Sequence, residues 1–278
     1  GFPLIVLWLV TAAVFFTGYL GFINIRGFSK AISLVSGTSG KANGSGEISH
    51  FQALSTAISG TVGVGNIGGV AVAISIGGPG AAFWLFVAGF LGMSTKFVEC
   101  TLGVKYRCEN LDGSVSGGPM YYLERYLLDR GFPKLGKLLG GFYALALVIG
   151  CFGIGNMFQS NQAYVQVLSI SGGENSFFAD KGWLFGLLLA GAVAAVIIGG
   201  IRSIGNVASK IVPFMAILYV FSAVIIIAMS AEHLIGAIGL IVSNAFESQS
   251  MTGGAIGAMI IGFQRAVFSN EAGIGSAS

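Results

Sequence analysis

The chain carries the stretch Gly60-Thr-Val-Gly-Val-Gly-Asn-Ile-Gly-Gly69 in the middle of an apolar run from about Phe51 to Ile76. Five glycines in ten residues are unfavourable in a helix, because each costs about 1 kcal/mol relative to alanine. In lipid, unpaired backbone N–H and C=O groups are costlier still. The stretch therefore predicts a broken transmembrane helix whose unpaired backbone groups face a polar cavity. Such breaks near the bilayer midplane are typical of secondary transporters.

The composition places the chain among helical membrane proteins. It is 54% hydrophobic and 9% charged over 278 residues, with a mean hydropathy of +0.85. Soluble domains carry about 25% charged residues. The apolar runs reach about 20 residues without alternation, which favours helices over a barrel. The three cysteines have no metal-binding spacing, so we predict neither a disulfide framework nor a metal or cofactor of that kind.

The hydropathy pattern predicts seven transmembrane spans and one shorter apolar segment. The spans cover about residues 3–22, 51–76, 81–105, 138–170, 183–200, 204–230 and 253 onward. Residues 234–246 are too short an apolar stretch to cross a bilayer, so we expect them to lie at its interface. Because the chain begins with Gly1 rather than Met and stops at Ser278, inside a polar stretch, we expect it to be a truncated, N-terminal part of a longer protein.

Lysine and arginine predict the orientation of these spans, because cytoplasmic loops carry the excess of basic residues. Eleven basic residues follow the first, third and fifth spans: Arg26, Lys30, Lys41, Lys105, Arg107, Arg125, Arg130, Lys134, Lys137, Arg202 and Lys210. The loops on the opposite side hold one, Lys181. We therefore predict a multi-pass protein of the cell membrane whose basic loops are cytoplasmic.

A second polar, glycine-rich interruption closes the chain, Phe268-Ser-Asn-Glu-Ala-Gly-Ile-Gly-Ser276. It lies five spans after the first, and an odd number of helices per repeat inverts the topology. We therefore predict an inverted-repeat fold with three parts. Residues 1–50 form an extra helix and a cytoplasmic loop, 51–230 a first five-helix repeat, and 231–278 an interfacial segment and the start of a second repeat. The alternative is that the glycines only permit close helix packing, as at Gly253 and Gly257.

The first predicted break offers groups that suit an ion and a small carboxylate. The Asn66 amide oxygen, beside unpaired backbone carbonyls, suits a hard cation, although an Asn here also caps a restarted helix. The Thr61 hydroxyl either binds an ion or substrate, or donates a hydrogen bond to the carbonyl four residues earlier in its own helix. Unpaired N–H groups around Gly63 and Gly65 suit a carboxylate and leave room only for a small substrate.

Several motifs carry a resemblance to a known family. The opening resembles the leucine-transporter fold in Ser59-Gly-Thr-Val-Gly-Val-Gly-Asn66, Gly77-Gly-Pro-Gly-Ala-Ala-Phe83 and Phe97-Val-Glu-Cys-Thr-Leu-Gly103. The chain resembles, more specifically, the alanine or glycine:cation symporter family in Gly118-Pro-Met-Tyr-Tyr122, Gly153-Ile-Gly-Asn-Met-Phe-Gln159 and Ser269-Asn-Glu-Ala-Gly-Ile-Gly-Ser276. That family belongs to the amino acid–polyamine–organocation superfamily. The resemblance covers the chain from Phe51 onward, and its last motif is highly specific.

The resemblance implies roles for two sets of residues in the first repeat. It implies that Asn66 is a sodium ligand, and it places the segment around Asn156 and Gln159 beside the substrate. We expect Gln159 to contact the polar groups of the amino acid. For Asn156, hydrogen bonding between helices is an equal alternative. The superfamily pattern further implies that Glu99 supports the unpaired N–H groups of the second break.

The second predicted break contributes further candidates. Phe268 precedes it and is placed to limit the size of the substrate side chain, against a default of ordinary packing. Ser269 and Asn270 offer oxygens to the sodium ion. Glu271 lies inside the break, where it either supports the backbone or carries charge. Lys96, three residues before Glu99, is expected to be paired, because ionisable residues inside a membrane usually are.

The predicted function is sodium-coupled symport of small neutral amino acids, alanine or glycine, into the cell. Sodium is the coupling ion, no other cofactor is expected, and the bilayer is the only other partner. Two alternatives stay open: an uncoupled facilitator or channel for small solutes, and a proton-coupled amino-acid transporter. A membrane enzyme would need a clustered acid–base or metal arrangement, which the sequence does not contain.

Overall fold

The computed structural model describes residues 4–36, 47–247 and 254–276. They form two units, residues Gly1–Lys105 with Ala208–Ser278, and residues Tyr106–Val207. Residues 37–46, which belong to the predicted cytoplasmic loop, and residue 253, where the seventh span is predicted to start, lie outside the described residues.

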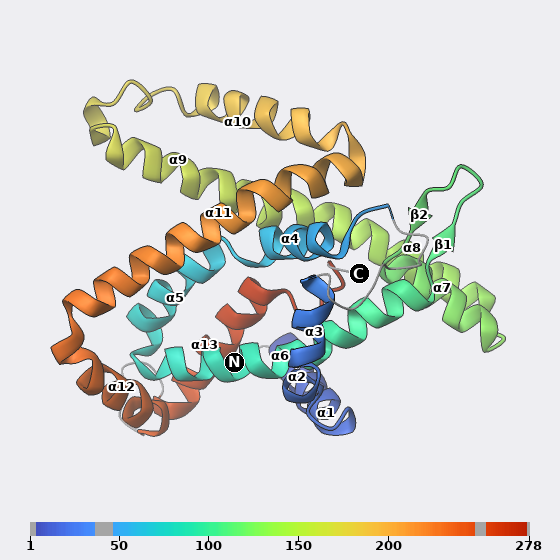
Figure 1. Ribbon diagram of the computed structural model, residues 1–278, viewed down its shortest axis with the longest axis horizontal. Helices are drawn as coiled ribbons and strands as arrows, with labels where there is room; N and C mark the ends of the chain where they lie inside the picture. The colour runs from blue at the N-terminus through green and yellow to red at the C-terminus, as the bar shows by residue number, and fades with distance from the viewer. Residues whose placement is uncertain (1–3, 37–46, 248–253, 277–278) are drawn as a thin grey trace. The chain divides into compact units, whose positions relative to one another are not determined.

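The helices of the first unit follow most of the predicted spans (Figure 1). They are α1 (Leu4–Tyr19), α2 (Ile23–Arg26), α3 (Phe28–Val35), α4 (His50–Thr61), α5 (Val64–Gly77), α6 (Gly80–Lys105), α12 (Ala231–Phe246) and α13 (Gly254–Asn270). The long helix α11 (Gly200–Met229) begins in the second unit and continues into the first. The short helices α2 and α3 occupy a region predicted to be loop.

The second unit contains a hairpin, four α-helices, a π-helix and a 3-10 turn. Its elements are β1 (Cys108–Glu109), β2 (Val115–Ser116), α7 (Pro119–Asp129), α8 (Pro133–Gly150), a π-helix (Cys151–Met157), α9 (Phe158–Ile170), a 3-10 turn (Gly173–Asn175) and α10 (Gly182–Ile197). The hairpin and α7 fall in the loop predicted after the third span. Helix α7 has a proline at its first position, where the missing N–H costs nothing.

Among the described residues, four helical stretches are long and apolar enough to cross a bilayer: His50–Gly77, Gly80–Lys105, Pro133–Ile170 and Gly200–Met229. The first of these is interrupted between α4 and α5. Helices α1, α10 and α12 are apolar but shorter, at 16 residues each. The all-α membrane class is thus confirmed. Helix α12, predicted to lie at the interface, is as long as α1 and α10, which are predicted to span the bilayer, so helix length does not distinguish them.

The core of the first unit lies where α13 packs between α5 and α6, with α1 against α6 (Figure 1). Val6, Ala88, Phe263 and Ala266 form its buried apolar centre. Small residues bring the helices close, because a Cβ added at Gly262 would lie 2.7 Å from the Ala81 carbonyl oxygen. Helix α13, which leads into the second break, therefore packs directly against α6 in this core.

Candidate ion and substrate site

The first break separates α4 from α5 at Val62 and Gly63. Helix α4 starts with a capping box, in which the Ser49 hydroxyl accepts from the Gln52 N–H and the Gln52 side chain accepts from the Ser49 N–H. It ends at Thr61, after which Val62 is extended, with φ −107° and ψ 97°. Helix α5 restarts at Val64. The glycine-rich stretch therefore breaks the helix, as its composition predicts.

Asn66 joins the two breaks through one oxygen. Its Oδ1 accepts a hydrogen bond from the Gly63 N–H at 3.4 Å and from the Ser269 hydroxyl at 2.7 Å. The first bond caps α5, which is the alternative role that the sequence left open for this residue. The second bond reaches α13, so Asn66 caps its helix and also contacts the second break. Its role as a sodium ligand stays a prediction.

Gly65 permits the close approach of α5 to α13. A Cβ added there would lie 3.2 Å from Ser269 Cα and 3.5 Å from Ser269 Oγ. The first distance is tighter than most real Cβ contacts and the second is an ordinary contact, so an added side chain would require the two helices to shift by a few tenths of an ångström. The missing side chain therefore serves a helix contact. The Gly63 N–H, which the sequence predicts to be unpaired, instead donates to Asn66 Oδ1. Contact of the backbone around Gly63 and Gly65 with a substrate carboxylate stays a prediction.

The second break begins where α13 ends at Asn270. The Asn270 Oδ1 accepts from the Ala272 N–H at 2.9 Å, which turns the chain out of the helix. Glu271, Gly273 and Gly275 then adopt positive φ values of 51°, 88° and 90°. Glycine adopts positive φ values without strain, which explains why glycines stand at 273 and 275. Glu271 is the exception, and its Oε2 accepts from the Ser276 hydroxyl.

Two charged side chains of α6 hold the second break from opposite ends. Glu99, with 7% of its side chain exposed, accepts a hydrogen bond from the Gly275 N–H. Lys96 Nζ lies 3.7 Å from Glu99 Oε2 and donates to the Glu271 carbonyl at 3.3 Å. The carboxylate thus meets an amide of the break and the ammonium meets a carbonyl. The sequence indicated the pair by its i, i+3 spacing, but it did not show that Lys96 contacts the break.

Two other candidates of the first unit have ordinary local contacts. The Thr61 hydroxyl donates to the Ala57 carbonyl at 3.0 Å, so the helix-internal bond left open by the sequence is present. Its oxygen still has lone pairs to offer. Phe268 is half-buried near the end of α13. For both residues, contact with ion or substrate stays a prediction.

Asn156 and Gln159 belong to the second unit. Both side chains are exposed within that unit. Asn156 lies in the π-helix and Gln159 two residues after it, in α9. Wide helical turns of this kind occur often at functional sites. The sequence predicted one continuous helix here, and only the glycines at 150, 153 and 155 hinted at an irregular turn. Contact of Asn156 and Gln159 with the substrate stays a prediction.

Comparison with known proteins gives one consistent family. A model of the sodium:alanine symporter family matches residues 1–278. The sodium/alanine symporter AgcS of Methanococcus maripaludis is 44% identical, over 99% of this chain and 59% of the relative. The putative sodium/proton-dependent alanine carrier protein YrbD of Bacillus subtilis is 42% identical, over 85% of this chain and 46% of the relative.

The same comparison widens the range of named substrates. The probable sodium/glutamine symporter GlnT of Bacillus subtilis is 36% identical, over 99% of this chain and 54% of the relative. The chain spans roughly half the length of these curated relatives, which are transporters and not enzymes. The match over the full chain and the 44% identity leave one conclusion: the chain belongs to the sodium:alanine symporter family.

Proposed function

We propose that the full-length protein carries a small neutral amino acid, alanine or glycine, into the cell together with sodium. The observation that carries the proposal is the hydrogen bond between Asn66 Oδ1 and Ser269 Oγ, which joins the first break to the second. Two broken helices that meet are the arrangement in which transporters hold ions and substrates. The proposal includes an inverted-repeat, leucine-transporter-like fold, a cell-membrane location and cytoplasmic basic loops.

The ion site in this proposal uses the oxygens at the contact between the breaks. Asn66 Oδ1 and Ser269 Oγ lie 2.7 Å apart, close enough for both to face one ion. The Thr61 hydroxyl lies on the last turn of α4, which leads into the same break. Hard cations prefer such carbonyl and hydroxyl oxygens. On sodium binding, Ser269 turns its proton away from Asn66, and both oxygens become ligands.

The substrate site in this proposal adjoins the ion. Backbone N–H groups near Gly63 and Gly65, at the start of α5, bind the carboxylate, helped by the positive end of the helix dipole. On the resemblance of their motif to the family, we assign the other polar groups of the amino acid to Gln159 and Asn156. Phe268 limits the side chain to the size of a methyl group. Glu99 and Glu271 support the backbone without touching the ligand.

A proton-coupled transporter is the second candidate. One relative is named a sodium/proton-dependent alanine carrier, and this chain has a buried carboxylate, Glu99, beside Lys96. The oxygen-rich contact between the breaks favours sodium, because it provides neutral oxygen ligands and no titratable group. An uncoupled facilitator remains a third outcome of the transport assay.

We expect the variants Asn66→Ala and Ser269→Ala to raise the sodium concentration for half-maximal uptake about tenfold, since a lost ligand worth about 1.4 kcal/mol changes affinity by that factor. The measurement is uptake of radiolabelled alanine into proteoliposomes holding the full-length protein, over a range of sodium gradients. Ser75→Ala is the matched control, because the Ser75 hydroxyl lies on the same helix, α5, and donates to the Ala71 carbonyl within that helix. Uptake driven by a pH gradient without sodium would support the proton-coupled candidate, and downhill flux that ignores both gradients would support a facilitator.

We expect Gln159→Ala to raise the alanine concentration for half-maximal uptake about tenfold or more, because the site would lose a hydrogen bond to a charged group. Asn161→Ala is the control, since it removes an exposed amide two residues further along the same helix. Competition by glycine, glutamine and larger amino acids in the same assay defines the substrate range. Equal effects of the two variants would contradict the placement of Gln159 at the substrate.

A further inference from the structure

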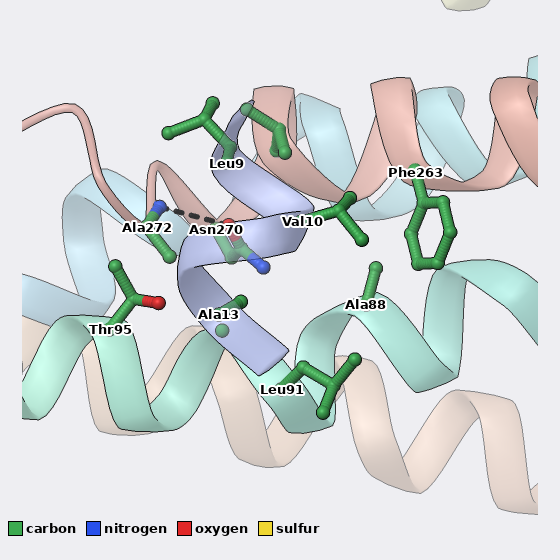
Figure 2. A pocket seen from close by; sticks show the side chains of 11 residues that line it. Leu9, Val10, Ala13, Ala88, Leu91, Thr95, Phe263, Asn270 and Ala272 are labelled. Carbon is green, nitrogen blue, oxygen red and sulfur yellow. Dashed lines mark hydrogen bonds between the residues drawn. The ribbon is translucent and has the colours of Figure 1, made fainter. Parts of the chain in front are cut away.

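A small cavity lies between α1, α6 and α13 in the first unit, on the side of α6 that faces α1 (Figure 2). Its volume is about 20 Å³. Most of its lining is apolar, including Leu9, Val10 and Ala13 of α1, Leu91 of α6 and Phe263 of α13. Two polar side chains also line it, Thr95 of α6 and Asn270 at the end of α13.

The Thr95 hydroxyl is buried without a hydrogen-bond partner among the described residues. The residue is 5% exposed. Other helical threonines of this chain, such as Thr17 and Thr101, donate to the carbonyl four residues earlier, at 2.7 Å in both cases. Thr95 does not, and Figure 2 shows its oxygen turned toward the space beside Asn270 and Ala13. Leaving a buried hydroxyl without a partner destabilises the folded protein, so a ligand in the cavity that bonds to it would remove this cost.

Asn270 presents its amide nitrogen to the same space. Its Oδ1 is held by the Ala272 N–H, which fixes the amide orientation and leaves Nδ2 on the cavity side (Figure 2). Gly92 makes room for this nitrogen, because a Cβ there would lie 3.0 Å from Asn270 Nδ2. The cavity therefore offers one N–H donor and one hydroxyl that can either donate or accept.

From these observations we infer that the cavity is a binding site for a single buried water molecule, which accepts from Asn270 Nδ2 and bonds to Thr95 Oγ1. A volume of 10–15 Å³ is enough for one water, and buried waters typically join two to four polar groups. A sodium ion does not fit this pair, because the amide turns its N–H group rather than its oxygen toward the cavity. An empty cavity would leave the hydroxyl unsatisfied.

The water links α6 to the residue at which α13 gives way to the second break. Helix α1 closes the cavity from the other side, and Leu9 lies so close to Gly273 that an added Cβ there would be 2.6 Å from Leu9 Cδ2. The helix that precedes the first repeat thus shields a polar contact that positions the second break. This inference rests on the cavity and its two polar groups, and it does not depend on the transported substrate.

The test is a structure of the full-length protein at a resolution that shows ordered water, for the wild type and for Thr95→Val. We expect one water peak within hydrogen-bond distance of Thr95 Oγ1 and Asn270 Nδ2, and we expect valine, which keeps the shape but lacks the hydroxyl, to remove it. Thr95→Ser should retain it. Hydrogen exchange at residues 271–275 should quicken about fivefold in the valine variant, as the loss of about 1 kcal/mol implies, and stay near the wild-type rate in the serine variant.

Three results would overturn the inference. The first is a dry cavity in the wild type, and the second is a direct bond between the two side chains. The third is a peak that exchanges for a heavier monovalent cation. Each is read from the wild type alone, so the test survives a valine variant that fails to fold. Equal exchange rates in the serine and valine variants would also count against it.

Discussion

Replacing Lys96 with methionine is expected to destabilise the full-length protein by about 3 kcal/mol, the lower end of the cost of leaving a buried charge, here that of Glu99, without its partner. Glu99 keeps only 7% of its side chain exposed, so its carboxylate would lose its cation without gaining water. The Glu271 carbonyl would lose its donor at the same time. The measurement is chemical or thermal unfolding of the purified protein.

A double variant makes this prediction specific. Lys96→Met combined with Glu99→Gln removes both charges, while the glutamine oxygen can still accept from the Gly275 N–H. We expect the double variant to recover at least half of the stability lost by Lys96→Met. Lys96→Arg, which keeps the charge, is the control for side-chain length. A double variant no more stable than the single one would show that Lys96 does not act through Glu99.

Gly262→Ala is expected to destabilise the protein by about 2 kcal/mol, as overpacking of a close helix contact does. A Cβ at Gly262 would lie 2.7 Å from the Ala81 carbonyl oxygen and 2.9 Å from the Leu85 amide nitrogen, so backbone must move. Separating α13 from α6 would also shift the second break away from Lys96 and Glu99. We therefore expect alanine uptake to fall together with stability.

The control for this variant is the same substitution on the facing helix. Nothing lies within 4 Å of a Cβ added at Gly89, in the middle of α6. Gly89→Ala should therefore stabilise the helix, by up to about 1 kcal/mol. If the same unfolding experiment shows that Gly262→Ala lowers stability and Gly89→Ala raises it, the loss at Gly262 is due to the helix contact and not to helix propensity. Equal destabilisation by both variants would contradict the contact seen at Gly262.

The sequence predicted the helical membrane class and the principal helices because these depend on local patterns. Long apolar runs mark the helices, and glycine-rich polar stretches mark the interruption after Thr61 and the end of α13 at Asn270. The pattern missed α2, α3 and α7, which are short helices in polar surroundings and carry weak hydropathy signals. It also missed the π-helix at Cys151–Met157, since one wide turn leaves no periodicity to detect.

The candidate site was predicted less completely than the fold, because a residue's type indicates which ligands it can bind but not which other residues it contacts. Asn66 and Ser269 were each proposed for sodium from their own positions, while their mutual hydrogen bond emerged only from the fold. Thr61 has the helix-internal bond that the sequence left open. The sequence does not single out Thr95, since a helical threonine usually donates its hydroxyl to a carbonyl of its own helix and no sequence pattern marks one that does not.

Composition and hydropathy alone determined that this chain is a helical membrane protein with one helix interrupted after Thr61 and another that ends in a polar, glycine-rich stretch at Asn270. The reason is that lipid requires long apolar helices and penalises unpaired backbone groups. The motifs of the chain also determined the family. Tertiary structure alone decided that Asn66 meets Ser269, 203 positions away, and that Lys96 and Glu99 hold opposite ends of the second break. The physical reason is range: helix formation depends on neighbours in the chain, whereas these contacts depend on small residues such as Gly65 and Gly262, which let distant helices approach.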